Sequence, residues 1–315
     1  MSDPLILVER VLQSLVSGLL IGSVYGLLCL GLGLIFGVMR VVNFAQGEFM
    51  MLAMYATMAV AYLLASSIGA SAAAYPAVII ATIAVAIFGG AVQRWLLAPL
   101  SETRIGQRSE GQNAQLILTL GLSLVIQNVA LMLLGSATVG LRTPLSSQAW
   151  EIDLGGAMSV FLNKARVIAA VLAVLVGLLA SISLKRLATG RHLRAAADDP
   201  DAATYCGVSV SRAHLVAFAL GTGLTALAGG LLATNYPFNP FVGLDFIVVM
   251  YAGVVLGGMG SIGGAFWGGM TIGMVQQTAS LVLPTQLQNT AIFVIFLLVI
   301  IVRPQGFFGR SVDRA

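Results

Sequence analysis

The sequence is poor in charged residues. Of its 315 residues only 9% are charged, whereas 58% are hydrophobic, and the mean hydropathy is +0.97. A soluble domain keeps about a quarter of its residues charged, because its surface must face water. The shortage of charge excludes an ordinary soluble protein and indicates a chain whose surroundings are largely lipid.

Cysteine and histidine are also scarce. Cys29 lies in an apolar run and Cys206 in a polar one, which argues against a disulfide framework. The two histidines, His192 and His214, fall in a loop and at the edge of a hydrophobic segment. Because no Cys/His grouping exists to bind a metal or to pair a nucleophile with a base, we expect no metal site and no enzymatic activity in this chain.

Clusters of basic residues are missing as well. The net charge is +4, but Lys and Arg are scattered singly with few aromatic residues among them, so nucleic acid is not an expected partner. Neither lysine, Lys164 or Lys185, follows a glycine, and the phosphate-binding pattern G-x-x-x-x-G-K-[ST] is therefore absent. Any ATP that drives this protein must bind to another chain.

Long hydrophobic runs, in contrast, are abundant. A helix rises about 1.5 Å per residue, so about 20 mostly apolar residues cross a hydrocarbon core of roughly 30 Å. The segments that approach this length are 11–36, 44–65, 75–97, 114–135, 166–184, 214–236, 241–256, 263–283 and 286–302. We predict an all-α fold, a polytopic transmembrane helical bundle of about 8–10 spans. The range reflects the stretch 38–47, which could be broken or re-entrant.

Lys and Arg are unequally shared between alternate loops. With a cytoplasmic C-terminus, twelve of the 16 basic residues lie on the cytoplasmic side and the remaining four on the other. The positive-inside rule favours this orientation. We expect one transmembrane domain over residues 1–315, with an outer loop at about 136–165 and a cytoplasmic loop at about 185–213.

The cytoplasmic loop has the composition of a short helical hairpin. Asp199 is a plausible N-cap for a helix whose first residue is Pro200. Gly207 suits the left-handed residue that closes such a helix. We therefore predict a short helix, closed at both ends, between two spans.

Several segments resemble the branched-chain amino acid permease family of ATP-binding-cassette (ABC) importers. Asp201, Ala202, Ala203 and Gly207 fit the E-A-A-x-x-x-G pattern of importer permeases, with Asp in place of Glu. The resemblance spans nearly the whole chain in the right order. The segments that carry it are VVNFAQGEFMMLAMY (41–55), GRHLRAAADDPDAATYCGV (190–208), VVLGGMGSIGGAFWGG (254–269) and RPQGFFG (303–309).

The resemblance implies a function and a set of partners. In this family the cytoplasmic loop docks into a cleft of the ATP-binding subunit. The residues we expect to make that contact are Arg191, Arg194, Asp198, Asp201, Ala202, Ala203 and Gly207. The implied partners are ABC ATPase subunits that bind ATP and Mg²⁺, a second permease subunit (the same or a related chain), a periplasmic substrate-binding protein and the lipid bilayer. The chain itself would hold no cofactor and would lie in a bacterial inner membrane.

Two aspects of function stay open at this point. The resemblance implies branched-chain amino acids as substrates, but the same architecture serves urea, amides and small organic or aromatic acids. The alternative function is an ion-coupled secondary transporter of amino acids, which needs charged groups deep in the bilayer. Only Glu48 and Asp245 are candidates for such a group.

Glu48 stands alone among apolar residues, shortly after Asn43 and Gln46. In one interpretation it stabilises the start of the second span, because carboxylates are favourable at helix N-termini. In the other, Asn43, Gln46 and Glu48 line the translocation path at a broken helix, where irregular backbone is tolerated beside a cavity.

The 36 glycines need a reason, since glycine weakens a helix. Gly18, Gly22 and Gly26 repeat at four-residue spacing, which lets helix backbones approach closely in lipid. Such a face could pack within the chain, line the interface with another subunit, or line the moving gate. The G-x-G-x-x-G string at 258–263 lacks the strand and helix of a nucleotide site, so we interpret it as a tight connection between spans.

Overall fold

The computed structural model describes residues 4–101, 108–141, 143–153, 159–284, 287–303 and 305–309. Arg104, Arg142, Arg310 and Arg314, which belong to the charge count above, lie outside these ranges. The elements, in chain order, are α1 (Pro4–Met39), α2 (Gln46–Ile68), α3 (Ala70–Val92), a π-helical turn η1 (Gln93–Leu97), α4 (Ala98–Ser101), α5 (Arg108–Leu134), β1 (Ala149–Asp153), β2 (Ser159–Asn163), α6 (Lys164–Arg186), α7 (Ala188–Asp198), α8 (Pro200–Tyr205), α9 (Val210–Ala233), α10 (Val242–Gly257), α11 (Ile262–Ala279) and α12 (Gln288–Val302).

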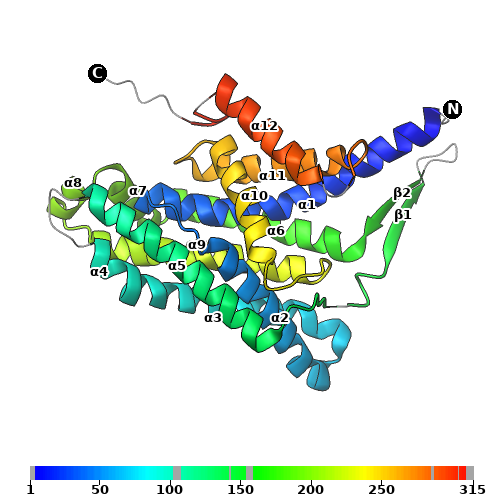
Figure 1. Cartoon of the computed structure of the whole chain (residues 1–315), viewed down its shortest axis with the longest axis horizontal. Helices are drawn as coiled ribbons and strands as arrows, with labels where there is room; N and C mark the ends of the chain where they lie inside the picture. Colours follow the sequence, from blue (N-terminus) through cyan, green and yellow to red (C-terminus); the bar gives the residue numbers. More distant parts are fainter. Residues whose placement is uncertain are drawn as a thin grey trace.

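The predicted helical membrane bundle is confirmed (Figure 1). By length and composition, six of the described helices can cross a membrane: α1, α2, α3 with its continuation to Leu100, α5, α6 and α9. The shorter helices α10, α11 and α12 occupy the other three predicted segments. Each of the nine apolar runs has therefore become a helix.

A β-hairpin interrupts the outer loop, and the all-α prediction did not foresee it. β1 and β2 pair antiparallel, with Ala149 opposite Asn163. The side chain of Gln13, on α1, donates to the carbonyl of Phe161 and accepts from its amide, both at 2.9 Å. These two bonds fasten the hairpin to the N-terminal part of α1. The chain is thus mostly helical, with one small sheet among the described residues.

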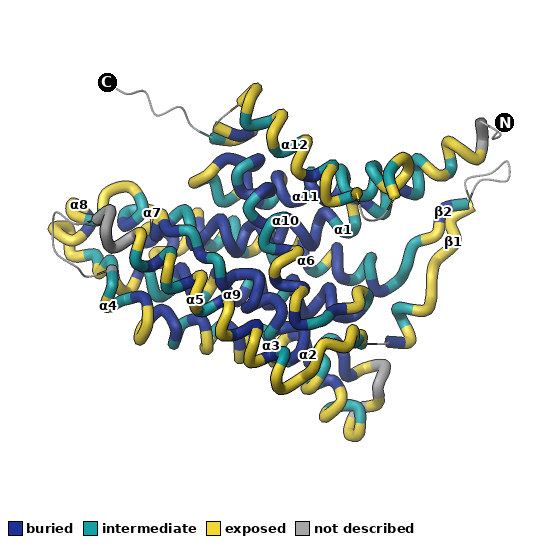
Figure 2. Tube along the Cα trace, in the orientation of Figure 1, coloured by how far each residue is buried: buried dark blue, intermediate teal, exposed yellow. Residues whose placement is uncertain are grey.

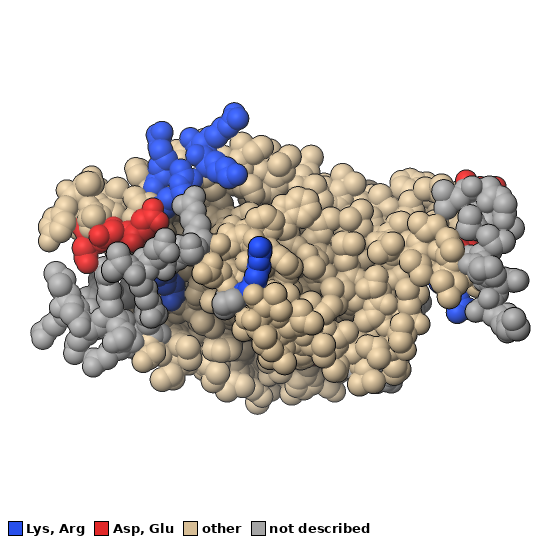
Figure 3. All heavy atoms as spheres, turned by 90° about the horizontal axis from the view of Figure 1, so that it is seen from above, with Lys and Arg blue, Asp and Glu red and all other residues tan. Residues whose placement is uncertain are grey.

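The two ends of the molecule differ in structure. The β-hairpin and the start of α1 lie at one end, and α7 and α8 lie at the other (Figure 1). Most of the charged side chains visible in Figure 3 gather toward the two ends, and mostly uncharged residues cover the band between them. This distribution is the one that a bundle crossing a bilayer requires, because charge is costly in hydrocarbon. We call the two ends the β-hairpin end and the α7–α8 end.

α1 and α9 form the centre of the bundle (Figure 2). In α1, 78% of the most apolar 18-residue window is buried and in α9 67%, whereas the value is 28% in both α5 and α6. The large, fully buried side chains include Leu27 and Leu28 of α1 and Phe218 of α9. Helices with a buried share as low as that of α5 and α6 turn most of their surface outward.

The glycines of α1 pack against α11 inside the chain. A Cβ on Gly22 would lie 2.5 Å from the carbonyl oxygen of Met270, and one on Gly26 would lie 2.7 Å from that of Phe266. A Cβ on Gly18 would meet the Cα of Met274 at 3.0 Å. The two backbones are therefore in direct contact, and this face is not an interface with another subunit. The interpretation as packing within the chain is correct.

The glycine string at 258–263 is a tight connection, as predicted. Gly258 and Gly260 have φ values of 100° and 98°, which side-chain-bearing residues rarely adopt. They turn the chain from α10 into α11. The amides of Phe307 and Phe308 donate to the carbonyls of Leu256 and Gly257, so the segment after α12 packs onto this turn.

Candidate functional site

The N-terminus of α8 is closed as the sequence predicts. A carboxylate oxygen of Asp199 accepts from the backbone amides of Asp201 (3.0 Å) and Ala202 (3.2 Å). Pro200 occupies the first turn, where its missing N–H costs nothing. These contacts make Asp199 the N-cap of α8.

The C-terminus of α8 is closed by a Schellman motif. Gly207 has φ +80° and donates to the carbonyl of Thr204, while Val208 donates to that of Ala203, both at 2.9 Å. This is the hydrogen-bond pattern that a left-handed glycine allows after a helix. The predicted short helix with two closed ends is therefore confirmed.

The hairpin of α7 and α8 packs on the ends of three long helices. Leu193 and Ala196 of α7 are buried in a cluster with side chains of α1, α6 and α9. Those side chains are Leu34, Val38, Leu184, Ala213 and Ala217. Gly190 lies so close to the carbonyl of Leu184 that a Cβ has no room. The hairpin is therefore fixed to the bundle rather than suspended from it.

The predicted contact residues divide into two groups. Arg191, Asp198, Asp201, Ala202 and Gly207 are exposed. Ala203 is only 6% exposed. Arg194 is exposed, but its guanidinium donates to the carbonyls of Leu184 and Lys185. Arg194 therefore caps the last turn of α6, where a cation also complements the helix dipole. The structure places Ala203 and Arg194 in contacts that shape the hairpin.

Tyr205, which the sequence analysis did not single out, is 90% exposed at the end of α8. Exposed aromatic side chains are common anchors of protein interfaces. The signal available in the sequence was an aromatic residue inside an otherwise polar loop.

The segment between α1 and α2 starts at Arg40. Its φ is 54°, which is uncommon for a residue with a side chain. Its amide still donates to the carbonyl of Phe36, and its guanidinium donates to the carbonyl of Ala197 on α7 at 2.9 Å. Arg40 thus links the end of α1 to the α7–α8 hairpin, directly before the chain runs to Glu48.

Asn43 and Gln46 form one buried network. Asn43 accepts from the amide of Ala45 at 3.1 Å and donates to the side-chain oxygen of Gln46 at 2.9 Å. Gln46 in turn donates to the hydroxyl of Thr225 (2.6 Å) and to the carbonyl of Gly221 (3.3 Å), both halfway along α9. The network satisfies irregular backbone inside the bundle, as membrane proteins require.

Glu48, in the first turn of α2, is 1% exposed. Its Oε1 accepts from the hydroxyl of Ser123 on α5 at 3.4 Å, and its Oε2 has no hydrogen-bond partner among the described residues. A Cβ on Gly243, in the first turn of α10, would lie 2.8–2.9 Å from the carboxylate. Two helix N-termini therefore meet at this carboxylate, and their dipoles favour its charge. The structure brings Asn43, Gln46 and Glu48 together, and a role in translocation stays a prediction.

α5 carries a polar stripe toward this network. Gln115, Thr119, Ser123 and Gln127 recur every four residues and are all buried. Gln115 donates to the carbonyl of Leu97 at 3.2 Å. Thr119 donates to the carbonyl of Val42 and accepts from the amide of Phe44, both at 3.4 Å. The four-residue spacing was visible in the sequence, but it was not recognised there as a stripe.

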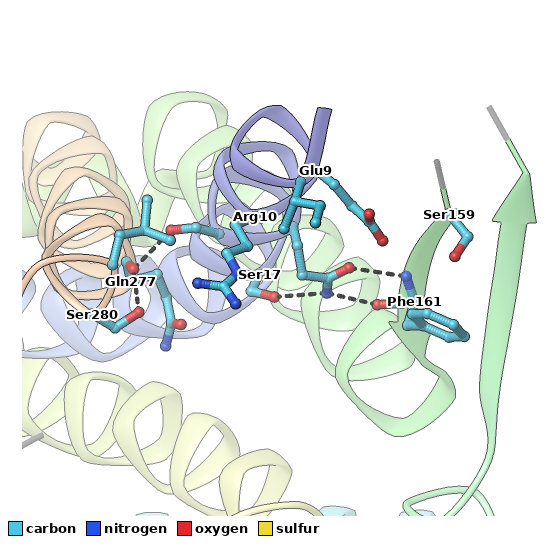
Figure 4. A pocket seen from close by; sticks show the side chains of 11 residues that line it. Glu9, Arg10, Ser17, Ser159, Phe161, Gln277 and Ser280 are labelled. Atoms are coloured by element: carbon cyan, nitrogen blue, oxygen red, sulfur yellow. Dashed lines mark hydrogen bonds between the residues drawn. The ribbon is translucent and has the colours of Figure 1, made fainter. Parts of the chain in front are cut away.

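A pocket of about 440 Å³ opens at the β-hairpin end, between α1, β2 and α11 (Figure 4). Its polar lining includes Glu9, Arg10, Gln13 and Gln277. This pocket lies at the opposite end of the molecule from the α7–α8 hairpin (Figure 1). Within the described part of the chain, no group of three or more His, Cys, Asp or Glu side chains could hold a metal ion.

The bundle consists of apolar helices, its charged side chains gather toward its two ends (Figure 3), and a capped helical hairpin lies at one of these ends. These features define a polytopic membrane protein. The family model described as "Branched-chain amino acid transport system / permease component" matches residues 14–302. The chain therefore belongs to this family of membrane permeases.

Relatives of known name agree with the family. The chain is 29% identical over 302 residues to the high-affinity branched-chain amino acid transport system permease protein LivH of Salmonella typhimurium, covering 95% of this chain and 96% of that protein. It is 30% identical over 308 residues to the protein BraD of Pseudomonas aeruginosa, with the same coverage. Among solved structures it matches PsaBC from Streptococcus pneumoniae in complex with Fab, with 13% identity over 93% of this chain and 92% of that chain and a TM-score of 0.47.

Proposed function

We propose that this chain is the membrane-spanning subunit of an ABC importer that carries branched-chain amino acids across a bacterial inner membrane. The observation that carries the proposal is the α7–α8 hairpin, a closed helical unit with an exposed acidic and aromatic surface at one end of an apolar bundle. Membership in the permease family and the names of the relatives LivH and BraD support the substrate class.

The proposal requires several partners. ABC ATPase subunits would bind ATP and Mg²⁺ and receive the exposed residues of the α7–α8 hairpin. A second permease subunit, the same chain or a related one, would complete the membrane part. A substrate-binding protein would dock at the β-hairpin end, where the pocket between α1, β2 and α11 offers a polar surface. The positive-inside orientation then places the α7–α8 end in the cytoplasm.

The contacts of the hairpin supply a route for force. Leu193 and Ala196 tie α7 to the ends of α1, α6 and α9, so a push on the hairpin moves these helices together. Arg40 ties α7 to the segment that begins α2. Closure of the ATPase dimer would therefore reach the network around Glu48 and bias a two-state opening of the bundle.

A charge on the exposed face of α8 tests this function. Ala202 is exposed and its neighbour Ala203 is buried, so Ala202→Lys changes the docking surface without disturbing the hairpin's packing. We expect Ala202→Lys to lower the co-purification of ATPase subunits and the ATP-driven uptake of L-leucine into proteoliposomes at least tenfold.

The matched control is Ala149→Lys, the same substitution at an exposed residue of β1, at the other end of the molecule. Its binding of ATPase subunits should equal that of the parent. Normal uptake and normal ATPase binding in Ala202→Lys would contradict the docking assignment.

The alternative of an ion-coupled transporter depends on Glu48. This carboxylate is buried, and one of its oxygens has no partner among the described residues, which would suit an ion-binding residue. Asp245, the other candidate, is exposed at the start of α10. Uptake of L-leucine by the purified single chain under an ion gradient, without ATP, would favour the alternative over the importer.

A further inference from the structure

Three buried polar atoms that lack hydrogen-bond partners in the described part of the chain lie along the line where α2 runs beside α5. They are Oε2 of Glu48, the hydroxyl of Tyr55 and Nε2 of Gln127, three of the eight such atoms among the described residues. Thr119 bonds to the segment at 42–44 and Ser123 bonds to Glu48, so the two helices run in the same direction. We call this contact, from Thr119 and Glu48 to Gln127 and Tyr55, the α2–α5 seam.

The three groups face the same seam because of helical spacing. Gln127 follows Ser123 by four residues, one turn farther along the same face of α5. Tyr55 follows Glu48 by seven residues, two turns farther along the same face of α2. The ring of Tyr55 packs edge-on against Phe238 with centroids 4.9 Å apart, and its hydroxyl has no hydrogen-bond partner among the described residues.

Unpaired polar atoms are expensive inside a protein. A buried donor or acceptor without a partner costs about 1–3 kcal/mol, and native structures contain few of them. Three on one seam, one of them a carboxylate oxygen, indicate a surface that binds a polar ligand. Glu48, Tyr55 and Gln127 are 1%, 7% and 7% exposed, so they are covered by protein and not by water.

The way α5 is attached allows the seam to open. Its contacts with the rest of the bundle include the hydrogen bonds of Gln115, Thr119 and Ser123, several of which are as long as 3.4 Å. Its other faces are exposed, including Ile117 (69%) and Val125 (60%). Hydrogen bonds of this kind can be exchanged for bonds to water or to a polar ligand at small net cost.

We propose that the α2–α5 seam binds the head group of an amino acid during its passage through the membrane. Glu48 accepts hydrogen bonds from the ammonium group, and the amide of Gln127 donates to the carboxylate. The hydroxyl of Tyr55 can serve either group. The proposal deepens the proposed function and rests on it for the amino acid substrate. It also gives the buried carboxylate a cationic partner, which a charge at membrane depth requires.

Thiol reactivity tests whether the seam opens to water. In the assembled complex, with Cys29 and Cys206 replaced by alanine, single cysteines replace Ser123 or Gln127 in the seam. The controls replace Leu124 or Val125, which are exposed on the same helix. In one nucleotide state, a charged, membrane-impermeant thiol reagent should modify the seam cysteines at least tenfold faster than the control cysteines. Lipid around the control positions suppresses the thiolate, which is the form that reacts.

Reaction at Leu124→Cys or Val125→Cys with none at Ser123→Cys and Gln127→Cys overturns the proposal, and so does reaction at none of the four. Uptake of L-leucine by the unlabelled parent complex reports the proposed function separately. A parent that imports L-leucine while its seam stays unreactive would contradict the seam alone. A parent that imports no L-leucine would contradict the proposed function.

Protection by ligand tests the assignment of the head group. L-leucine should slow the modification of Ser123→Cys, whereas 4-methylpentanoate, which lacks the ammonium group, should not. Adding Glu48→Gln should raise the L-leucine concentration that gives half-protection at least tenfold, while adding Asn128→Ala, at an exposed residue of α5, should leave it unchanged. Equal protection with and without the Glu48→Gln substitution would overturn the role of the carboxylate.

Discussion

Two contacts between helices of this bundle are built in opposite ways. Where α1 meets α11, Gly22 and Gly26 bring backbone against backbone. The hydroxyls of Ser14 and Tyr25 also donate across this contact, to the carbonyl of Gln277 (2.7 Å) and the side-chain oxygen of Gln276 (2.8 Å). Where α2 meets α5, Ser123 and Glu48 make a long hydrogen bond and Nε2 of Gln127 has no partner among the described residues. The first contact is dense and its hydrogen bonds are short, whereas the second is polar and incompletely satisfied.

The difference shows how a membrane protein separates its rigid parts from its moving ones. Lipid is as apolar as leucine, so apolar side chains gain little by leaving it, and close packing and hydrogen bonds decide which helices stay together. Backbone contact at Gly18, Gly22 and Gly26 leaves no gap for lipid or water at these positions of the α1–α11 contact. The α2–α5 seam is not packed in this way. It contains buried polar side chains that could form hydrogen bonds to a polar ligand.

The largest effect is expected where the dense contact is broken. A Cβ on Gly22 meets the carbonyl oxygen of Met270 at 2.5 Å, so Gly22→Ala must push α1 from α11, at a cost of about 3 kcal/mol. Gly37 lies on the same helix with nothing within 4 Å of its Cβ position, and Gly37→Ala should be neutral or stabilising by up to about 1 kcal/mol. Thermal unfolding of the purified proteins in detergent measures both. Equal melting temperatures would show that the α1–α11 contact is not tight.

A substitution in the polar seam should increase stability, whereas Gly22→Ala should decrease it. Gln127→Leu removes a buried amide whose Nε2 has no partner among the described residues, so it should raise stability by about 1–2 kcal/mol, while uptake of L-leucine falls at least tenfold. Unfolding and uptake are measured on the same preparation. Asn128, the next residue, is exposed and bonds to the carbonyl of Leu124 in its own helix, so Asn128→Leu should leave uptake unchanged. If Gln127→Leu proved less stable than the parent, the contrast between the two contacts would be lost.

The contact of the α7–α8 hairpin with α6 lies between these extremes, because it is partly apolar and partly polar. Arg194→Ala removes charge-assisted bonds to the carbonyls of Leu184 and Lys185 and should destabilise the hairpin locally by about 1.5 kcal/mol. Faster amide hydrogen exchange in α7 is the expected readout. Arg191→Ala changes an exposed arginine of the same helix and should not alter that exchange. Equal exchange in both variants would refute the capping role.

The smallest effect is expected at the N-cap of α8. Asp199→Ala removes the acceptor for two amides and should cost about 1 kcal/mol, confined to this helix. Hydrogen exchange at the amides of Asp201 and Ala202 should rise, and Asp199→Asn should restore most of the protection. A global loss of stability would mean that the hairpin carries more of the fold than its contacts indicate.

Local signals in the sequence predicted the elements well. Apolar length gave the nine segments that form helices, and Asp199, Pro200 and Gly207 gave both ends of α8, because caps depend on neighbours in the chain. Asn43, Gln46 and Glu48 were recognised as a group for the same reason. Their shared network and its partner Ser123 appear only when α5 lies beside α2.

Contacts between distant segments could not be predicted. Nothing near Gly22 shows that Met270 is its neighbour, and nothing near Arg194 shows that it caps α6. Apolar residues also do not reveal which face of a membrane helix is buried, since lipid and protein interior are equally apolar. On α5 only the polar residues mark the inner face, and the stripe from Gln115 to Gln127 does so.

The polar links of the hairpin also affect how relatives of this protein can diverge. The guanidinium of Arg40 donates to the backbone carbonyl of Ala197, and that of Arg194 donates to the carbonyls of Leu184 and Lys185. Every amino acid supplies such a carbonyl. These links therefore place no demand on the side chain at positions 184, 185 or 197. Substitutions there need no compensating change in either arginine, so paired variation between sequences would not reveal two of the contacts that join the hairpin to the bundle.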